Sequence, residues 1–496
     1  MDFKRFGKNT VIYAIGNGCM RAVTFLLIPL YTHSLTLREY GLLSALFVTS
    51  QIMIILMSVG TQKGFVRFAK ECEDRGLMGK LMGSTLAITV LGFFFVGGIS
   101  LLFLMPLFRQ WLETKAIQDY ILLTCLSAFA QAIYTHTTSY YRATEKGLYF
   151  MGANLTALLL LIGTNIILLR IFSHGVEGVL LAQVLTYGGV GLFFLFLVVT
   201  KTGLGFSLEL VKRLLSFSFP LLFAMSWDLV METSAIYLLG YFGNLEQVAI
   251  YSLGHKLAQI GYISLIFPFQ LAYEPFVYGN IEHPRLRRSI SKLLTYLMLT
   301  YALISFALVF LSRPLLSIIA PPDYFSARTV VFLMLPGIAF IGVYYIGESL
   351  LGIKNRTPLT GGTVIFFTLL SLLLNYLLIP HWGVYGAIFV FNVTTMLTAV
   401  LLMALAKKVF PIPLEAVRLG WIGGLFVFFL FFVFMLGDAP ASVYYAVIPC
   451  VGGIVLTLLY LAPFFDEEEK AIIKSVFKFS RLKRSPKWVF FNGGKG

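Results

Sequence analysis

Long apolar runs separated by short polar segments follow one another along almost the whole chain. A helix that crosses a bilayer needs about 20 mostly apolar residues, and these runs have that length. They lack the alternation that marks the strands of a membrane barrel. The pattern therefore predicts an all-α polytopic membrane protein with fourteen transmembrane helices, at residues 9–31, 42–60, 80–105, 118–141, 149–169, 176–200, 214–239, 246–272, 290–311, 327–350, 359–379, 384–406, 416–436 and 443–462.

Composition agrees with this pattern and narrows the chemistry. Of the 496 residues 58% are hydrophobic and only 12% are charged, which is typical of a membrane protein and not of a large soluble core. The cysteines are scattered without metal or redox spacing and are interpreted as small packing residues. No Walker, zinc-protease or nucleophile-elbow motif occurs, so we expect neither an enzyme nor a cofactor or structural metal.

Charge is distributed unevenly between the two sides of the predicted membrane. With a cytoplasmic N-terminus, the cytoplasmic segments carry 30 of the 38 Lys and Arg, and the opposite loops carry six. This positive-inside bias predicts that both termini are cytoplasmic. The basic residues that give the chain its net charge of +15 are therefore expected to face anionic lipid headgroups. No nucleic-acid partner is predicted.

The chain repeats itself at an offset of about 210 residues. One match joins Asn165 and the following Gly175-Val-Glu-Gly to Asn375 and the following Gly383-Val-Tyr-Gly. Both copies lie around the end of the fifth span of a six-span unit. An even unit gives both copies the same orientation, and transporters built from such parallel repeats bind substrate between the halves. The predicted divisions are an N-lobe at 1–205, a C-lobe at 206–410, spans thirteen and fourteen at 411–465, and an amphipathic basic tail at 466–496.

Two cations lie deep inside predicted spans, and they are the strongest candidates for substrate contact. Arg21 is in the first span, and Lys256 is in the eighth, beside His255 and one turn before Gln259. A charge in mid-bilayer costs roughly 2.5–3.5 kcal/mol on insertion scales, so it usually faces a cavity or a partner. The pair could hold an anionic group such as a phosphate from both halves. The alternative is an internal ion pair that locks the halves.

A second polar group points to ion coupling. Asp228 and Glu232 are four residues apart in the seventh span, which places them on one helical face. Two close carboxylates tend to share a proton, and they could also bind sodium, with Asp228 as the candidate ligand. Asn375 and Thr394, together with Asn392 and Thr395, could complete an oxygen-rich site. Ordinary hydrogen bonding between helices is the alternative for these residues.

Four further residues are weaker substrate candidates. His136 and Tyr140 lie in the fourth span, where aromatic faces could stack on sugars, although an interfacial aromatic belt is the more common reason for such residues. Lys63 and Arg67 follow the second span one turn apart. They could attract phosphate at a cytoplasmic entrance, or they could be plain positive-inside anchors.

Several short segments resemble a known group of transporters. They are Pro29-Leu30 followed by Glu39-Tyr40-Gly41, the segment Tyr324-Phe-Ser-Ala327, and the stretch from Asn375 to Gly386. Together with the basic start, they resemble the Wzx-type polysaccharide flippases of the multidrug/oligosaccharidyl-lipid/polysaccharide (MOP) exporter superfamily. The resemblance covers nearly the whole chain.

The resemblance implies two six-helix lobes in a V shape plus two extra helices. It implies transfer of a polyprenyl (undecaprenyl) diphosphate-linked oligosaccharide to the outer leaflet of a bacterial cytoplasmic (inner) membrane by alternating access, coupled to an ion gradient or membrane potential. Membrane lipids, glycosyltransferases and a glycan polymerase are the implied partners. In the related peptidoglycan-precursor flippases the last two spans form a lipid groove, and cationic positions match Arg21 and Lys256. A cation-coupled drug exporter and a membrane glycan polymerase or ligase are the alternatives.

Overall fold

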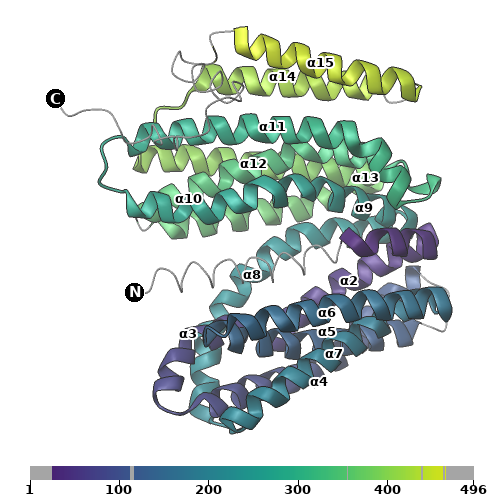
Figure 1. Cartoon of the computed structure of the whole chain (residues 1–496), viewed down its shortest axis with the longest axis vertical. Helices are drawn as coiled ribbons and strands as arrows, with labels where there is room; N and C mark the ends of the chain where they lie inside the picture. The colour runs from purple at the N-terminus through teal and green to yellow at the C-terminus, as the bar shows by residue number, and fades with distance from the viewer. Residues whose placement is uncertain (1–24, 112–116, 355, 437–439, 462–463, 465–496) are drawn as a thin grey trace, which may run out of the picture. The chain divides into compact units, whose positions relative to one another are not determined.

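The computed structural model describes residues 25–111, 117–354, 356–436, 440–461 and 464, and within these ranges it is helical without a strand (Figure 1). The elements are α2 (Leu37–Ser58), α3 (Thr61–Asp74), α4 (Met78–Trp111), α5 (Ile117–Ala143), α6 (Gly147–Ile166), η1 (Ile167–Ile171), α7 (Gly175–Thr202), α8 (Leu208–Phe242), α9 (Leu245–Gly261), η2 (Tyr262–Ile266), α10 (Phe267–Gly279), α11 (Leu286–Ile319), η3 (Pro322–Tyr324), α12 (Ala327–Ile353), α13 (Thr357–Val409), α14 (Ala416–Met435) and α15 (Ala441–Leu461).

These helices cover the ranges predicted for the second to the fourteenth span. Eight of the described helices are long and apolar enough to cross a membrane. The stretch from α9 through the π-helical turn η2 to α10 coincides with the predicted eighth span. α13 contains both the eleventh and the twelfth predicted spans. Gly383 takes a positive φ of 52° and bends the helix between the two spans. That conformation favours glycine.

The helix α3 lies outside every predicted span, and several other helices run past their predicted bounds. α3 buries Phe65, Ala69 and Cys72 while Lys63 and Arg67 stay exposed. α4 and α11 extend beyond their predicted spans, to Trp111 and to Ile319. Both extensions contain a proline, Pro106 in α4 and Pro314 in α11, and a proline in the sequence is ordinarily a signal for a helix end.

The described part of the chain packs as two compact units. Unit 1 combines the chain up to Gly254 with Leu315–Val330 and Val364–Phe391, and unit 2 combines His255–Pro314, Val331–Thr363 and the chain from Asn392. Packing of this kind does not test the predicted repeat boundary between residues 205 and 206, so the two lobes stay a prediction.

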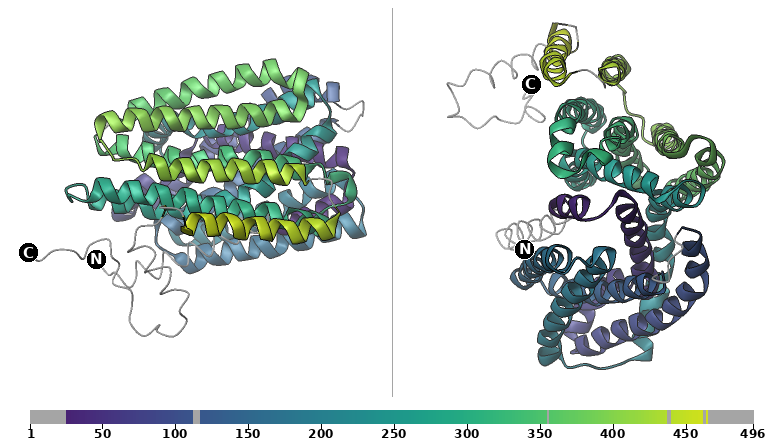
Figure 2. Two further views of the ribbon diagram at one scale, coloured as in Figure 1. Left: turned by 90° about the horizontal axis from the view of Figure 1, so that it is seen from above. Right: turned by 90° about the vertical axis from the view of Figure 1, so that its right-hand side faces the viewer.

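Unit 1 is built on a bundle in which α5 lies against α7, α4 and α2, and α6 lies against α7 (Figures 1 and 2). Glycines allow the closest approaches. A side chain at Gly83 would overlap the carbonyl oxygen of Gly205, and one at Gly92 would overlap that of Met57. Small residues at helix contacts are typical of membrane bundles, where packing replaces the hydrophobic effect between helices.

Unit 2 has a continuous apolar core formed by α10, α11, α12 and the second half of α13. α14 and α15 pair with one another in the same unit (Figure 2). The fully or almost fully buried side chains of the core share an aliphatic or aromatic character and include Val277, Ile290, Leu294, Ile346, Leu350, Leu351, Leu402 and Phe410.

The segments that carry the family resemblance meet in unit 1. Thr36 and Glu39 form a capping box at the start of α2, in which each side chain accepts from the other's backbone N–H. The next residue, Tyr40, is buried against the ring of Tyr324, with centroids 5.6 Å apart. The Tyr324 hydroxyl donates to the Thr36 carbonyl at 3.4 Å. The Glu39-Tyr40-Gly41 motif is therefore a packing motif for the region of Tyr324.

An ion pair ties α3 to the start of α8. Both terminal guanidinium nitrogens of Arg213 donate to the carboxylate of Glu71, at 3.1 and 2.8 Å. This hydrogen bonding, followed by the coulombic attraction of Arg213, lowers the pKa of Glu71 below its ordinary value of 4.5. The contribution to stability is therefore fully present above pH 4.5 and is lost as the pH falls through the lowered pKa.

We expect Glu71→Gln to lower the midpoint of thermal unfolding slightly at neutral pH, with the difference from wild type shrinking as the pH falls below 4.5. The pair is partly exposed, so the effect should be small. Scanning calorimetry in detergent over a pH series measures it. Glu73→Gln is the control, since Glu73 faces only the exposed Lys70 at 3.7 Å. Equal pH profiles for the two variants would contradict the assignment.

Candidate functional site

One polar stripe follows the helix from α9 to α10 in unit 2. His255 is 6% exposed, Lys256 is partly exposed, and the amide nitrogen of Gln259 lies 3.2 Å from Nε2 of His255. His255 and Gln259 are four residues apart and so share a helical face. The structure thus brings these two candidates into direct contact and places Lys256 beside them in the chain.

The stripe continues beyond the residues that sequence reasoning selected. The hydroxyl of Tyr262 lies 3.1 Å from that of Tyr345 on α12, and the amide of Gln270 donates to Glu274 at 3.3 Å. Both Tyr262 and Gln270 were missed. Tyr262 follows Gln259 by three positions, so the helical spacing of polar residues could have found it.

Asn375 on α13 contacts α8 inside unit 1. Its amide donates to Ser234 at 3.2 Å, while its side-chain oxygen is buried without a hydrogen-bond partner among the described atoms. Ser234 is two residues beyond Glu232, so this side-chain contact joins α13 to the part of α8 that follows the two acids. The side chains of Asp228 and Glu232 lie outside the described part, as does Arg21. The proposed ion ligands therefore stay a prediction.

Thr394 and Asn392 belong to unit 2. Thr394 is fully buried, and its carbonyl accepts from Thr398 at 2.6 Å. Asn392 makes two hydrogen bonds to the backbone of α12. Its oxygen accepts from the backbone of Gly337 at 2.6 Å, and its nitrogen donates to the carbonyl of Leu333 at 2.7 Å. These two backbone groups flank Pro336, whose ring nitrogen has no hydrogen to donate, so both amide atoms of Asn392 pair with the backbone of α12 around the proline.

We expect Asn392→Leu to destabilise the protein by about 0.6–2 kcal/mol, because the backbone groups of Leu333 and Gly337 around Pro336 lose this partner. Thermal unfolding in detergent measures the loss. The matched control is Thr395→Val, which also removes a polar group from the same turn of α13. Among the described residues, no hydrogen bond joins the Thr395 side chain to α12. An Asn392→Leu protein as stable as the control would contradict the bridging role.

His136 and Tyr140 lie inside the bundle of unit 1. His136 is fully buried and its Nε2 lies 2.9 Å from the hydroxyl of Thr89, while Tyr140 accepts from Lys146 at 3.0 Å. This geometry favours packing, and contact of these residues with substrate stays a prediction. Lys63 and Arg67 are exposed on α3, as expected for either a phosphate entrance or an anchor.

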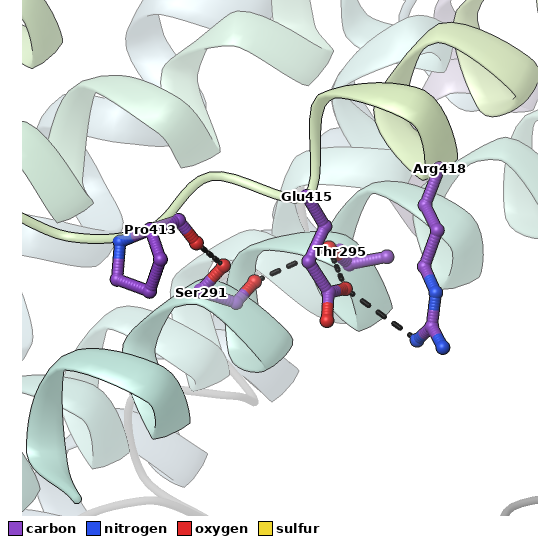
Figure 3. Close-up of polar contacts among 5 residues, drawn as sticks. All are labelled: Ser291, Thr295, Pro413, Glu415 and Arg418. Carbon is purple, nitrogen blue, oxygen red and sulfur yellow. Dashed lines mark hydrogen bonds and ion pairs between the residues drawn. The ribbon is translucent and has the colours of Figure 1, made fainter. Parts of the chain in front are cut away.

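A cluster of polar contacts holds the start of α14 against α11 (Figure 3). Thr295 donates to the carboxylate of Glu415 at 2.8 Å, and Arg418 approaches the same oxygen at 3.5 Å. Ser291 donates to the carbonyl of Pro413. Beyond this attachment α14 carries an apolar groove of about 360 Å³, lined by Val417, Gly420, Trp421, Gly424 and Leu425. Among the described residues no three His, Cys, Asp or Glu side chains gather into a metal site.

The family model described as "Polysaccharide biosynthesis protein" matches residues 6–277, which is more than half of the chain. The chain belongs to this family. The resemblance inferred from the motifs is thereby confirmed. The long apolar helices of the described residues support a membrane protein. No curated protein sequence matches the chain.

Solved structures show which fold this family member has. A structure titled lipid II flippase MurJ, inward closed conformation, aligns with a TM-score of 0.71 at 11% identity, covering 94% of this chain and all of that one. An inward-facing multidrug resistance MATE family transporter of the MOP superfamily aligns at 0.64 and 15% identity, covering 78% and 94%. A MOP superfamily transporter from Pyrococcus furiosus aligns at 0.55 and 16% identity, covering 82% and 95%. The fold is therefore that of the MOP transporters.

Proposed function

We propose that this protein is a flippase that moves a polyprenyl (undecaprenyl) diphosphate-linked oligosaccharide from the cytoplasmic to the outer leaflet for surface polysaccharide biosynthesis. The observation that carries the proposal is the match to a polysaccharide biosynthesis family by a chain whose fold aligns along 94% of its length with a lipid II flippase. A bacterial inner membrane with both termini in the cytoplasm is the corresponding location.

Three parts of the chain have separate roles in this proposal. Lys256, with His255 and Gln259 beside it, binds the diphosphate together with Arg21, because a cation inside a span compensates an anion there. The groove on α14 holds the apolar polyprenyl chain. Asp228 and Glu232 couple proton or sodium binding to alternating access, and the ion must bind one conformation better than the other to shift it.

A drug exporter is the second candidate, because multidrug MATE structures share the fold and Asp228 and Glu232 could bind cationic drugs. Deleting the gene in its own host separates the two. We expect the deletion to abolish surface polysaccharide and to accumulate the lipid-linked oligosaccharide, with wild-type protein restoring both. Unchanged polysaccharide together with increased drug susceptibility would replace the flippase assignment with the exporter.

A further inference from the structure

A groove with a mixed polar and apolar lining opens in unit 1 where the three resemblance-bearing segments meet. Its volume is about 610 Å³, within the range of roughly 300–1,000 Å³ that ligand pockets have. Its walls come from the start of α2, the turn between α8 and α9, the region of η3 and the bend of α13. Each of these is a connection between an odd and the following even predicted span, so the positive-inside orientation places all four on the outer face.

Exposed aromatic side chains form one wall of the groove. Trp382 is 53% exposed and Tyr385 is 60% exposed, and the two residues lie on either side of the bend at Gly383. The Trp382 ring is held edge-on to Phe389, with centroids 5.7 Å apart and an interplanar angle of 80°. An aromatic ring that is fixed in this way keeps a face available for an apolar surface of a ligand.

Carboxylates and amides, with two aliphatic hydroxyls and the imidazole of His381, form the polar lining. Glu246 and Asp323 supply acceptors, and Asn244 and Gln247 supply amides. The side-chain oxygen of Gln247 is buried without a hydrogen-bond partner among the described atoms, whereas Glu246 and Asp323 are exposed. Gly383 leaves the Gln247 oxygen room, since a side chain at that position would come within 2.8 Å of it.

This combination matches the chemistry of a sugar. A pyranose ring has an apolar C–H face that can lie on an aromatic ring, and hydroxyl groups that donate to carboxylate and amide oxygens. Two carboxylates repel a diphosphate or an acidic sugar, so the lining favours neutral or amino sugars. Trp and Tyr also occur at membrane interfaces as simple anchors. An anchor needs no surrounding concavity of acceptors, and this feature separates the two interpretations.

We propose that this groove is an exit site that binds the neutral or amino-sugar part of the translocated oligosaccharide on the outer face, apart from the diphosphate site. The inference rests on the proposed flippase function. Binding here stabilises conformations in which the glycan has already crossed, and so favours completion of transfer over return of the headgroup.

The test measures binding of the oligosaccharide that mild acid releases from the lipid-linked precursor of the deletion strain. The probe, tritium-labelled at its reducing end, is dialysed against purified full-length protein in nanodiscs. We expect Trp382→Leu to weaken binding about tenfold and the pair Glu246→Gln with Asp323→Asn to weaken it similarly, while Trp382→Tyr retains it. Phe206→Leu is the control, because Phe206 is 59% exposed but does not line the groove.

Each outcome has a definite meaning once thermal unfolding shows that the variants are folded. Wild-type binding that Trp382→Leu does not weaken overturns the exit site and leaves Trp382 as a membrane anchor. Absence of wild-type binding also overturns it, while the proposed function stands if wild type still clears the precursor in cells. A deletion strain that accumulates no precursor overturns the proposed function and the exit site together.

Discussion

Replacing Lys256 with alanine is expected to reduce surface polysaccharide export about 10–100-fold at normal expression. Lys256 lies within the predicted eighth span beside the paired His255 and Gln259, where the diphosphate is proposed to bind. Loss of a charged hydrogen bond to an anion costs about 1.5–3 kcal/mol, and 1.4 kcal/mol corresponds to a factor of ten. Complementation of the deletion strain, scored by polysaccharide and by accumulated precursor, measures the effect.

Two companion variants separate charge from folding. Lys256→Arg keeps the cation and should retain part of the export, whereas Lys407→Ala removes an exposed lysine at the end of α13 and should leave export unchanged. Arg21→Ala is expected to resemble Lys256→Ala, because the proposal assigns the two cations to one diphosphate. Full export by both alanine variants would remove these residues from the substrate site.

The second large effect is expected at Gly41. A methyl group there would overlap the carbonyl oxygen of Leu245, a backbone atom at the start of α9 that no rotamer change can move. Gly41→Ala should therefore separate α2 from α9 and lower the free energy of unfolding by about 1–3 kcal/mol. The midpoint of thermal unfolding in detergent, measured with the amount of folded protein in the membrane, reports this loss.

Gly189→Ala on α7 is the matched control. No atom lies within 4 Å of the side chain that it would add, so only the better helix propensity of alanine remains, and stability should be equal or higher by up to about 1 kcal/mol. A Gly41→Ala protein that unfolds together with the control would show that α2 and α9 do not approach as closely as described.

The sequence predicted the helices well because the apolar runs that must cross a bilayer are also the strongest signal in a chain. The bend in α13 followed from the same signal, since the predicted spans stop and restart around Pro380 and Gly383. α3 was missed because it is short and charged. Its buried Phe65, Ala69 and Cys72 have helical spacing, and this weaker amphipathic pattern could have identified it.

The site was predictable only where one helix supplies the contact. His255 and Gln259 pair as their spacing requires, but Asn392 could not be distinguished from an ion ligand by its chemistry alone. Its amide pairs with backbone groups of α12 around Pro336, which is 56 positions earlier in the chain. The groove at Trp382 was also missed, because four segments that are distant in sequence form its walls.

The most direct test of lipid-linked glycan transfer uses purified protein in liposomes that contain the precursor isolated from the deletion strain. A membrane-impermeant oxidant of sugars, added outside, labels only glycans in the outer leaflet. Liposomes with wild-type protein are expected to expose the inner-leaflet precursor over time, while those with Lys256→Ala do so at least about tenfold more slowly. Folded wild-type protein that leaves the inner-leaflet pool protected, with or without an ion gradient, would contradict the flippase assignment.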